Sequence, residues 1–212
     1  NKERPQGALK ISSTVAFGSV FLASRMKEFV NRYPEIDVSL VLADTELDLS
    51  MRQADVAIRL TPPTQPDLVQ RHLLTLRYRI YAAPEYLQQY GMPKSAKDLD
   101  NHRIVVYGDD ARPPVANLNW LLLDGAKGGI ARKPVLRVNS IYGILRAVQS
   151  GLGVGALPEY MGREIGNLVE VLPELQGPVL NMYFVYPEEL RDSARIIAFR
   201  DFIVEKLAPM RR

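Results

Sequence analysis

The stretch that decides the fold is ALKISSTVAFGSVFLASRMKEFVNRYPEIDVSLVL, which occupies residues 8–42. A strand enters at Ala8, where apolar and polar side chains begin to alternate. Across 17–33 the apolar side chains recur at helical spacing, and Pro34 ends this predicted helix. Alternation returns over 36–42 and predicts a second strand. Two strands joined by a helix are typical of neighbouring parallel strands in an α/β sheet.

The alternation of strands and helices continues along the chain. Asp44 and Thr45 are predicted to cap a short helix that reaches about Gln53, before a short buried strand over 55–60. Later strands are predicted over 68–74, 78–82, 103–107, 119–123, 135–138, 154–157, 168–172 and 179–186. Because ligands of open parallel sheets bind beyond the carboxyl ends of the strands, the polar residues at these ends are candidate binding residues.

The composition is that of an ordinary globular protein, and it excludes several kinds of site. The chain has 212 residues, of which 47% are hydrophobic, so it can bury a core in one domain or in two small ones. It contains no cysteine, which excludes disulfides, thiolate zinc sites and a cysteine nucleophile. A net charge of +3 is a poor footprint for a nucleic-acid-binding domain. No apolar run reaches the roughly 18 residues that a membrane span needs.

No local motif predicts catalysis or a cofactor. The run Gly151-Leu-Gly-Val-Gly155 follows a predicted helix and leads into a strand, which is the reverse of a dinucleotide-binding fingerprint. It therefore predicts a helix end and a tight turn. His72 and His102 lie in unrelated settings without a neighbouring set of ligands, and we expect structural or exposed roles for both. We accordingly predict no catalytic residue, no metal site and no cofactor.

Polar residues precede two of the predicted helices. Ser12, Ser13 and Thr14 lie before the first, and Asn139 and Ser140 lie before a later one. Unpaired backbone N–H groups and the helix dipole favour an anion at such positions. Plain N-capping is the alternative explanation, and it accounts for most Ser, Thr and Asn residues at helix starts.

Several longer segments occur in a characteristic order and spacing. They are Gly7-Ala-Leu-Lys-Ile-Ser-Ser-Thr-Val-Ala-Phe-Gly18, Phe29-Val-Asn-Arg-Tyr-Pro-Glu-Ile36, Asp55-Val-Ala-Ile-Arg59, Ala82-Ala-Pro-Glu-Tyr-Leu87, Gly91-Met-Pro, Leu99-Asp-Asn-His102 and Ser150-Gly-Leu-Gly-Val-Gly-Ala-Leu-Pro158. No single segment is specific, but the ordered set resembles the effector-binding domain of LysR-type transcriptional regulators. The resemblance covers nearly the whole chain, from about Gly7 to Leu207.

This resemblance implies an α/β fold of two Rossmann-like lobes, similar to the type 2 periplasmic binding proteins, with an effector in the cleft between the lobes. Residues 1–7 would be the remnant of a connector. The first lobe would comprise 8–78 and 180–212, and the second lobe would comprise 79–179. The two extended runs over 78–82 and 179–186 are suited to serve as crossovers between the lobes.

The positions of the family that line the cleft can be transferred to this chain residue by residue. They match Ser12, Ser13, Thr14, Asp44, Thr45, Arg59, Leu60, Val138, Asn139 and Ser140. We expect them to bind a small organic effector that is an anion, with Arg59 as its ion partner. Ile141 and Tyr142 depart from the smaller residues that are common in the family, so the identity of the effector cannot be transferred.

The resemblance also implies partners and a location. It predicts a regulatory domain of a cytoplasmic bacterial transcription factor, an antiparallel homodimer of this domain and a tetramer of the longer protein, without membrane contact. Because the chain starts at Asn1, we expect a missing N-terminal winged helix-turn-helix that alone contacts DNA. Two alternatives stay open: a free-standing solute-binding protein of a transport system, and an enzyme on the same two-lobed fold.

Overall fold

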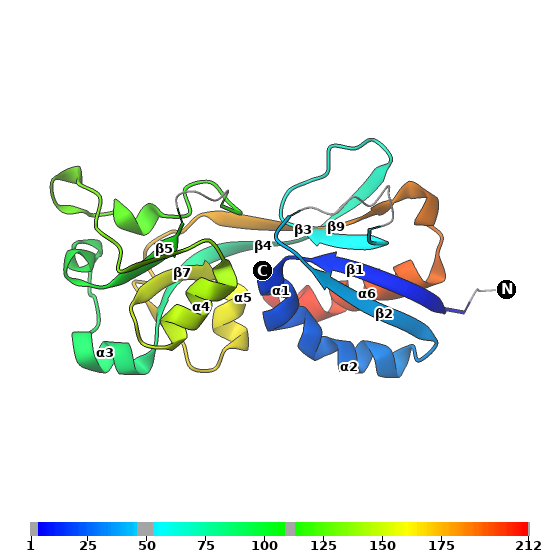
Figure 1. Cartoon of the computed structure of the whole chain (residues 1–212), viewed down its shortest axis with the longest axis horizontal. Helices are drawn as coiled ribbons and strands as arrows, with labels where there is room; N and C mark the ends of the chain where they lie inside the picture. The colour runs from blue at the N-terminus through cyan, green and yellow to red at the C-terminus, as the bar shows by residue number, and fades with distance from the viewer. Residues whose placement is uncertain (1–3, 46–52, 109–112, 212) are drawn as a thin grey trace. The chain divides into compact units, whose positions relative to one another are not determined.

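The structure is a computed structural model that describes residues 4–45, 53–108 and 113–211. The chain divides into two compact units, which we call unit 1 and unit 2 (Figure 1). Unit 1 comprises Asn1–Thr75 and Asn181–Arg212, and unit 2 comprises Leu76–Leu180. Unit 1 is therefore built from two separate segments of sequence, whereas unit 2 is one continuous segment.

The chain passes from one unit to the other within two long strands. These strands are β4 (Leu68–Ala82) and β9 (Val179–Pro187). The prediction of two separate strands over 68–74 and 78–82 is wrong, because β4 runs through without a break. Its buried side chains alternate across the supposed gap, where Leu76 is 1% exposed and Tyr78 is 1% exposed. The polar residues Thr75 and Arg77 belong to the other, outward-facing side of the same strand.

The sheet of unit 1 has the parallel order that the first 60 residues predict. Strand β1 (Gly7–Ser13) lies between β2 (Ile36–Leu42) and β3 (Val56–Arg59), and it is parallel to both. Strand β9 adds to β3 in the antiparallel direction. The carboxyl ends of β1, β2 and β3 consequently lie at the same edge of this sheet.

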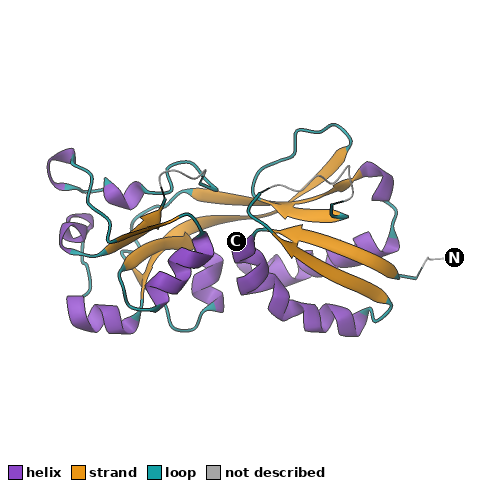
Figure 2. Ribbon diagram, in the orientation of Figure 1, coloured by secondary structure: helices purple, strands orange, loops and turns teal. Residues whose placement is uncertain are grey.

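One helical run joins β1 to β2. It consists of α1 (Val15–Phe17), a π-helical turn (Gly18–Leu22) and α2 (Ala23–Arg32). A second helix, α6 (Ala194–Leu207), lies on the same side of the sheet (Figure 2). The two helices meet through Phe29 of α2, whose ring centre lies 5.1 Å from that of Phe202 on α6. Burial of this aromatic cluster holds the helical layer on the sheet.

The sheet of unit 2 is mixed. Its strands are β4, β5 (Ile104–Tyr107), β6 (Leu136–Val138), β7 (Val154–Pro158) and β8 (Val169–Val171). Strand β5 is parallel to both β6 and β7, and β4 is antiparallel to β7 and β8. Its helices are α3 (Pro84–Tyr90), α4 (Ile141–Gln149) and α5 (Glu159–Glu164).

The glycine run after α4 ends the helix, as the sequence predicts. Gly151 has a φ of 86°, a left-handed backbone conformation that glycine adopts without strain. Gly155 lies in β7 directly beneath α4, where a Cβ atom would come within 2.8 Å of Val148. The run therefore packs a helix closely on a strand, and it leads into β7 as the sequence predicts.

Arg132 organises the irregular part of unit 2. Its side chain is 6% exposed and its Nε donates to Oδ1 of Asp100 at 2.7 Å. The guanidinium also donates to the backbone oxygens of Leu121 at 2.7 Å, Asp124 at 2.6 Å and Ala96 at 3.0 Å. One buried cation thus joins three turns that have no strand pairing of their own.

The predicted strand over 119–123 is wrong. The chain forms a 3₁₀ turn over Trp120–Leu122 instead. The side chain of Asn119 accepts from the backbone N–H of Tyr107 at 3.0 Å and donates to its carbonyl at 2.8 Å. These are the backbone groups that a neighbouring strand would otherwise pair with, so the amide side chain takes the place of a strand.

Candidate functional site

In unit 1 the predicted polar residues lie together at the carboxyl ends of β1 and β2. Ser13 ends β1 opposite Leu42, and the N–H of Ala43 donates to the Ser13 carbonyl at 3.0 Å. This pairing brings Thr14 and Asp44 to the same edge of the sheet. Ser12 and Ser13 are 6% and 2% exposed, so their backbone and side chains form the floor of this edge. Ser13 also donates its hydroxyl to the Thr14 carbonyl at 3.2 Å.

Thr14 caps the N-terminus of α1, the helix that follows β1. Thr14 accepts a hydrogen bond from the N–H of Phe17 at 3.2 Å, which is ordinary N-capping. The carboxylate of Asp44 accepts from the N–H of Val15 at 3.1 Å. A negatively charged group therefore already lies against the positive end of this helix, as the helix dipole favours. The sequence predicted the position of Asp44 but not this contact.

The other predicted residues of unit 1 differ in exposure. Arg59 is the last residue of β3 and is 7% exposed, while Leu60 after it is half-buried. Arg59 has an interaction of its own in the structure, so its role as ion partner of an effector stays a prediction. Thr45 is exposed beside Asp44. The helix predicted from these two residues to Gln53 falls largely on 46–52, outside the described residues.

In unit 2 the predicted residues lie at the end of β6. Val138 is in register with Tyr107 of the parallel strand β5, and the N–H of Gly108 donates to the Val138 carbonyl at 3.1 Å. Ser140 caps α4, because its hydroxyl accepts from the N–H of Gly143 at 3.2 Å. Asn139 is exposed between them. The two edges are alike, because in each a polar residue follows a strand and a hydroxyl caps the next helix, Thr14 in unit 1 and Ser140 in unit 2.

Tyr107 and Asn119 lie at the same end of β5 and were missed by sequence reasoning. Together with Leu118 and Ile144 they line a small cavity of about 10 Å³. That volume has room for about one water molecule and is too small for an organic effector. None of the ten predicted site residues lines this cavity. No sequence signal could have identified Asn119, because its structural role is a hydrogen bond to the backbone of Tyr107, twelve residues away.

The structure describes the two edges separately. Ser12 to Leu60 belong to unit 1, and Val138, Asn139 and Ser140 belong to unit 2. Their participation in one shared site stays a prediction. Among the described residues no group of three His, Cys, Asp or Glu side chains could hold a metal ion.

The two histidines have different partners. His72 Nε2 lies 2.9 Å from Oγ1 of Thr75 and 3.2 Å from Oδ1 of Asn181. His102 Nδ1 lies 2.6 Å from the hydroxyl of Tyr86, which is fully buried. Burial lowers the pKa of His102, although the nearby carboxylate of Asp98 acts in the opposite direction. When His102 is neutral, Tyr86 can donate its proton to Nδ1, so this pair favours the neutral imidazole.

We expect the stability of the domain to fall as the pH falls below the usual histidine pKa of about 6.5. Because the folded state lowers the pKa of His102, its stabilising contribution is complete above that value and is lost as the pH falls through the folded pKa. Urea unfolding between pH 7.5 and 5.5 measures this loss. His102→Asn should flatten the profile and His72→Asn should preserve it. Equal profiles for the two variants would contradict the assignment.

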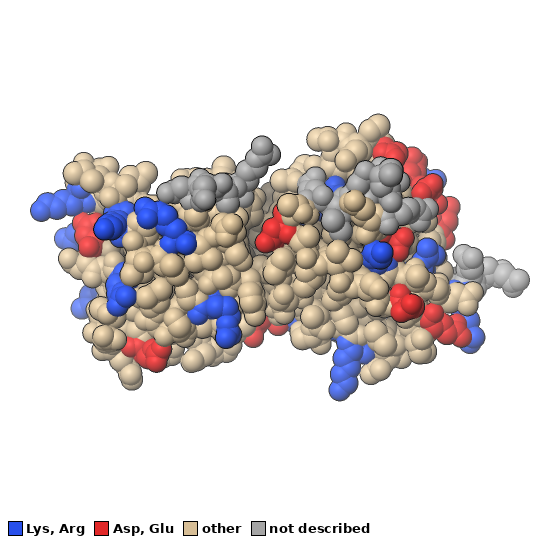
Figure 3. All heavy atoms as spheres, in the orientation of Figure 1, with Lys and Arg blue, Asp and Glu red and all other residues tan. Residues whose placement is uncertain are grey.

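On the face that Figure 3 shows, several Lys and Arg side chains gather over unit 2 with Asp and Glu side chains interspersed among them. In the part of the chain that the structure describes, no helix has both the length and the apolar character to cross a membrane.

Comparison with known proteins identifies close relatives along almost the whole length. A family profile described as the LysR substrate binding domain matches residues 2–208. The HTH-type transcriptional regulator CrgA of Neisseria meningitidis serogroup C (strain 8013) is 30% identical over 209 residues, which are 97% of this chain and 69% of that protein. The HTH-type transcriptional activator TtdR of Escherichia coli (strain K12) is 32% identical over 207 residues, which are 95% of this chain and 65% of that protein.

Solved structures agree with these matches. The regulatory domain of CrgA from Neisseria meningitidis, a LysR-type transcriptional regulator, superimposes with a TM-score of 0.80 at 30% identity, covering 96% of this chain and all of that one. The full-length virulence activator AphB of Vibrio cholerae has a TM-score of 0.70 at 21% identity, covering 97% of this chain and 70% of that one, and it supports the fold. The chain thus spans about two thirds of the length of CrgA and of TtdR.

Proposed function

Because this chain belongs to the LysR substrate-binding domain family, we propose that it is the ligand-sensing regulatory domain of a bacterial LysR-type transcription factor. It has the two-lobed α/β fold of the periplasmic-binding-protein type. The relatives are transcriptional regulators, which favours this function over that of a free-standing solute-binding protein. It also favours ligand binding without catalysis, and we propose that the domain is not an enzyme.

The effector that we propose is a small organic anion. The observation that carries this proposal is the N-terminus of α1, where the Val15 N–H already binds a carboxylate, that of Asp44. The N–H groups of Phe17 and Gly18 at this helix start already donate to Thr14, and the helix dipole favours negative charge. Thr14 and the buried Ser13 lie directly beside it. An anionic group of the effector would take up donors at this position in competition with Asp44.

The edge of unit 2 supplies a second polar set, Asn139 and Ser140, at the start of α4. We propose that these residues contact the same effector as the edge of unit 1, with lobes over 8–78 and 180–212 and over 79–179. Effector binding would act on transcription through its different affinity for two states of the protein, because a ligand that binds both equally shifts nothing.

A thermal-shift screen of small carboxylates and neutral metabolites tests this function. A ligand at about 100 times its Kd should stabilise the domain by about 2.7 kcal/mol, which corresponds to a rise in Tm of roughly 5–10 °C. Asn139→Leu should remove most of this rise, because a bulky apolar residue would replace an exposed amide at the site. Asn101→Leu, at another exposed asparagine of unit 2, is the matched control and should retain the rise. An equal rise in both variants would contradict the site.

A second arm of the same screen uses Asp44→Asn. Removing this charge should tighten the binding of anionic hits by about two- to fivefold, since one like charge at the surface contributes up to about 1 kcal/mol. Neutral hits should bind as before. Asp37→Asn, at the other end of β2, is the control, because it removes the same charge far from the helix start. A gain that is the same for both variants would assign the effect to net charge alone.

We further propose the partners that the family resemblance implies. This domain would form a homodimer, and the longer protein would form a tetramer. DNA contact would belong to a winged helix-turn-helix that precedes this segment, in line with the HTH-type description of the relatives and with the share of their length that the chain spans. The protein would act in the cytoplasm, without contact to a membrane.

A further inference from the structure

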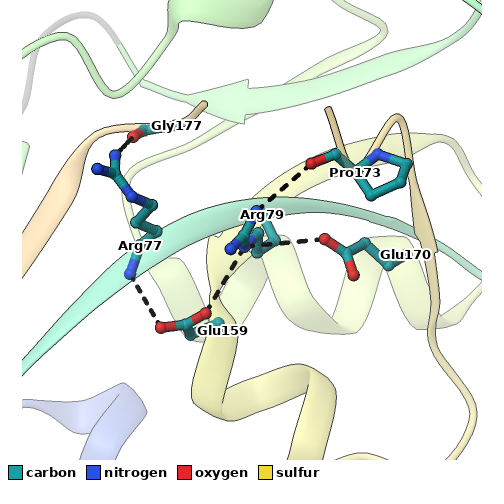
Figure 4. A network of polar contacts seen from close by, with 6 residues as sticks. All are labelled: Arg77, Arg79, Glu159, Glu170, Pro173 and Gly177. Carbon is teal, nitrogen blue, oxygen red and sulfur yellow. Dashed lines mark hydrogen bonds and ion pairs between the residues drawn. The ribbon is translucent and has the colours of Figure 1, made fainter. Parts of the chain in front are cut away.

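Two arginines on the same face of β4 in unit 2 have different electrostatic surroundings (Figure 4). The Nε atom of Arg79 lies 3.6 Å from Oε2 of Glu159 and 3.8 Å from Oε1 of Glu170. Its NH1 also donates to the carbonyl of Pro173 at 3.5 Å. With a side chain 18% exposed, Arg79 is a largely buried cation between two carboxylates. Its charge is therefore compensated within the unit.

No carboxylate in the described part of the chain compensates the guanidinium of Arg77 in this way. The guanidinium donates through NH1 to the carbonyl of Gly177 at 3.2 Å, and among the described residues it forms no ion pair with a carboxylate. Glu159 contacts the backbone N–H of Arg77 at 3.3 Å, while its carboxylate pairs with the side chain of Arg79. In Figure 4 the second terminal nitrogen of Arg77 points away from this network. A guanidinium has five N–H donors, and the structure shows one hydrogen bond from that of Arg77 to a described residue. The other donors could bind an additional acceptor.

The backbone acceptor of Arg77 is rigidly placed. A Cβ atom at Gly177 would overlap the carbonyl oxygen of Tyr78, so this backbone packs directly on β4. The N–H of Tyr78 donates to the carbonyl of Pro178 at 2.9 Å and holds the two segments together. Arg77 is itself half-buried. A guanidinium that is positioned in advance loses little entropy when it binds a planar or tetrahedral oxyanion.

We propose that Arg77 is an oxyanion-binding residue of unit 2, which binds a carboxylate or phosphate group of the effector. The inference rests on the proposed function and extends it, because it assigns the charged partner of the effector to Arg77, which the family resemblance does not single out. A half-buried cation that has no carboxylate partner among the described residues is unfavourable, and a bound oxyanion would remove that penalty through two charge-assisted hydrogen bonds.

The chain contains a natural reporter for this site. Trp120 is the single tryptophan of the sequence and is 7% exposed. Its Cη2 atom lies 3.0 Å from the position that a Cβ atom at Gly177 would take. Gly177 thus contacts the indole on one side and accepts from Arg77 on the other. An anion that draws the guanidinium from the Gly177 carbonyl should change the fluorescence of Trp120.

The test titrates the protein with sodium benzoate and with sodium phosphate at constant ionic strength and follows Trp120 fluorescence. The wild type should give a saturable change with at least one of the two anions. Arg77→Gln should weaken that binding at least about tenfold, because it removes a charged hydrogen-bond donor. Arg77→Lys should retain part of the affinity, since it keeps the charge without the planar fork. A response to benzoate alone identifies a carboxylate subsite, and a response to phosphate alone identifies a phosphate subsite.

Arg103→Gln and Arg146→Gln are the matched controls. The first of these arginines donates to the hydroxyl of Tyr90 at 2.7 Å and the second to the side chain of Gln149 at 3.2 Å, so both have neutral partners at other places in unit 2. Both controls should bind the anion as the wild type does. A wild type without a saturable response to either anion, or an Arg77→Gln variant that binds normally, would overturn the proposal. If Arg77→Gln binds normally while Asn139→Leu loses stabilisation by the screened metabolite, Arg77 is excluded and the proposed function stands.

Discussion

Replacing Phe29 by alanine should lower the free energy of unfolding by about 3–5 kcal/mol, the largest loss that we expect from one side chain. Phe29 is fully buried in unit 1. Its ring lies edge-on to Phe199, with centroids 5.5 Å apart, and 5.1 Å from the ring of Phe202. On its own helical run it also meets Tyr33 at 5.2 Å. Alanine would remove apolar contacts on every side and leave a cavity between α2 and α6.

Val30→Ala is the control for this variant. Val30 follows Phe29 on α2 but is 42% exposed, so its truncation should change stability by less than about 1 kcal/mol. Differential scanning calorimetry of both variants measures the difference. Comparable losses for Phe29→Ala and Val30→Ala would show that the aromatic cluster is not the main support of the helical layer.

Arg132→Ala should destabilise unit 2 by about 3 kcal/mol or more. The substitution removes a side chain that is 6% exposed and leaves the carboxylate of Asp100 without this cation. It also leaves the carbonyls of Leu121, Asp124 and Ala96 without their donor. A hydrogen bond from a charged donor typically contributes about 1.5–3 kcal/mol, and this substitution removes the bonds to three backbone carbonyls together, while the carboxylate of Asp100 stays partly in contact with water.

Urea unfolding followed by Trp120 fluorescence reports this loss in the affected unit, since Leu121, an acceptor of Arg132, lies next to Trp120 in the same 3₁₀ turn. Arg132→Lys should recover only a small part of the stability, because one ammonium cannot reach acceptors on three turns. Lys133→Ala, at the exposed neighbour, should be within about 0.5 kcal/mol of the wild type. A normal midpoint for Arg132→Ala would refute the role of this side chain as the organiser of the turns.

The regular part of the fold could be predicted because it depends on local periodicity. Strands β1 and β2 occur where alternation predicts them, and the helical run between them ends before Pro34. The polar residues at the strand ends could be predicted from the same pattern, because a parallel sheet places these ends at one edge. This reasoning located Thr14 and Asp44 on the same edge, where Asp44 binds the helix start.

What the sequence could not predict depends on contacts between distant residues. Asn119 replaces a strand by bonding to the backbone of Tyr107, and no local pattern encodes that pairing. Burial at strand ends is equally invisible: Ser13 is polar and lies at a helix start, yet it is 2% exposed. A bulky residue there would disturb the sheet, so Asn139 is the better position for testing the site. The sequence likewise could not show that Arg79 pairs with Glu159 and Glu170 and that Arg77 pairs with no carboxylate among the described residues.

The discontinuous make-up of unit 1 has a consequence for synthesis on the ribosome. Unit 2 is complete once Leu180 has emerged, so it can begin to fold while translation continues. Unit 1 must wait for Asn181–Arg212, because the part of β9 that pairs with β3 and all of α6 lie in that segment. Until then Phe29 of α2 lacks its partner Phe202 on α6, and transiently exposed apolar surface of this kind favours aggregation.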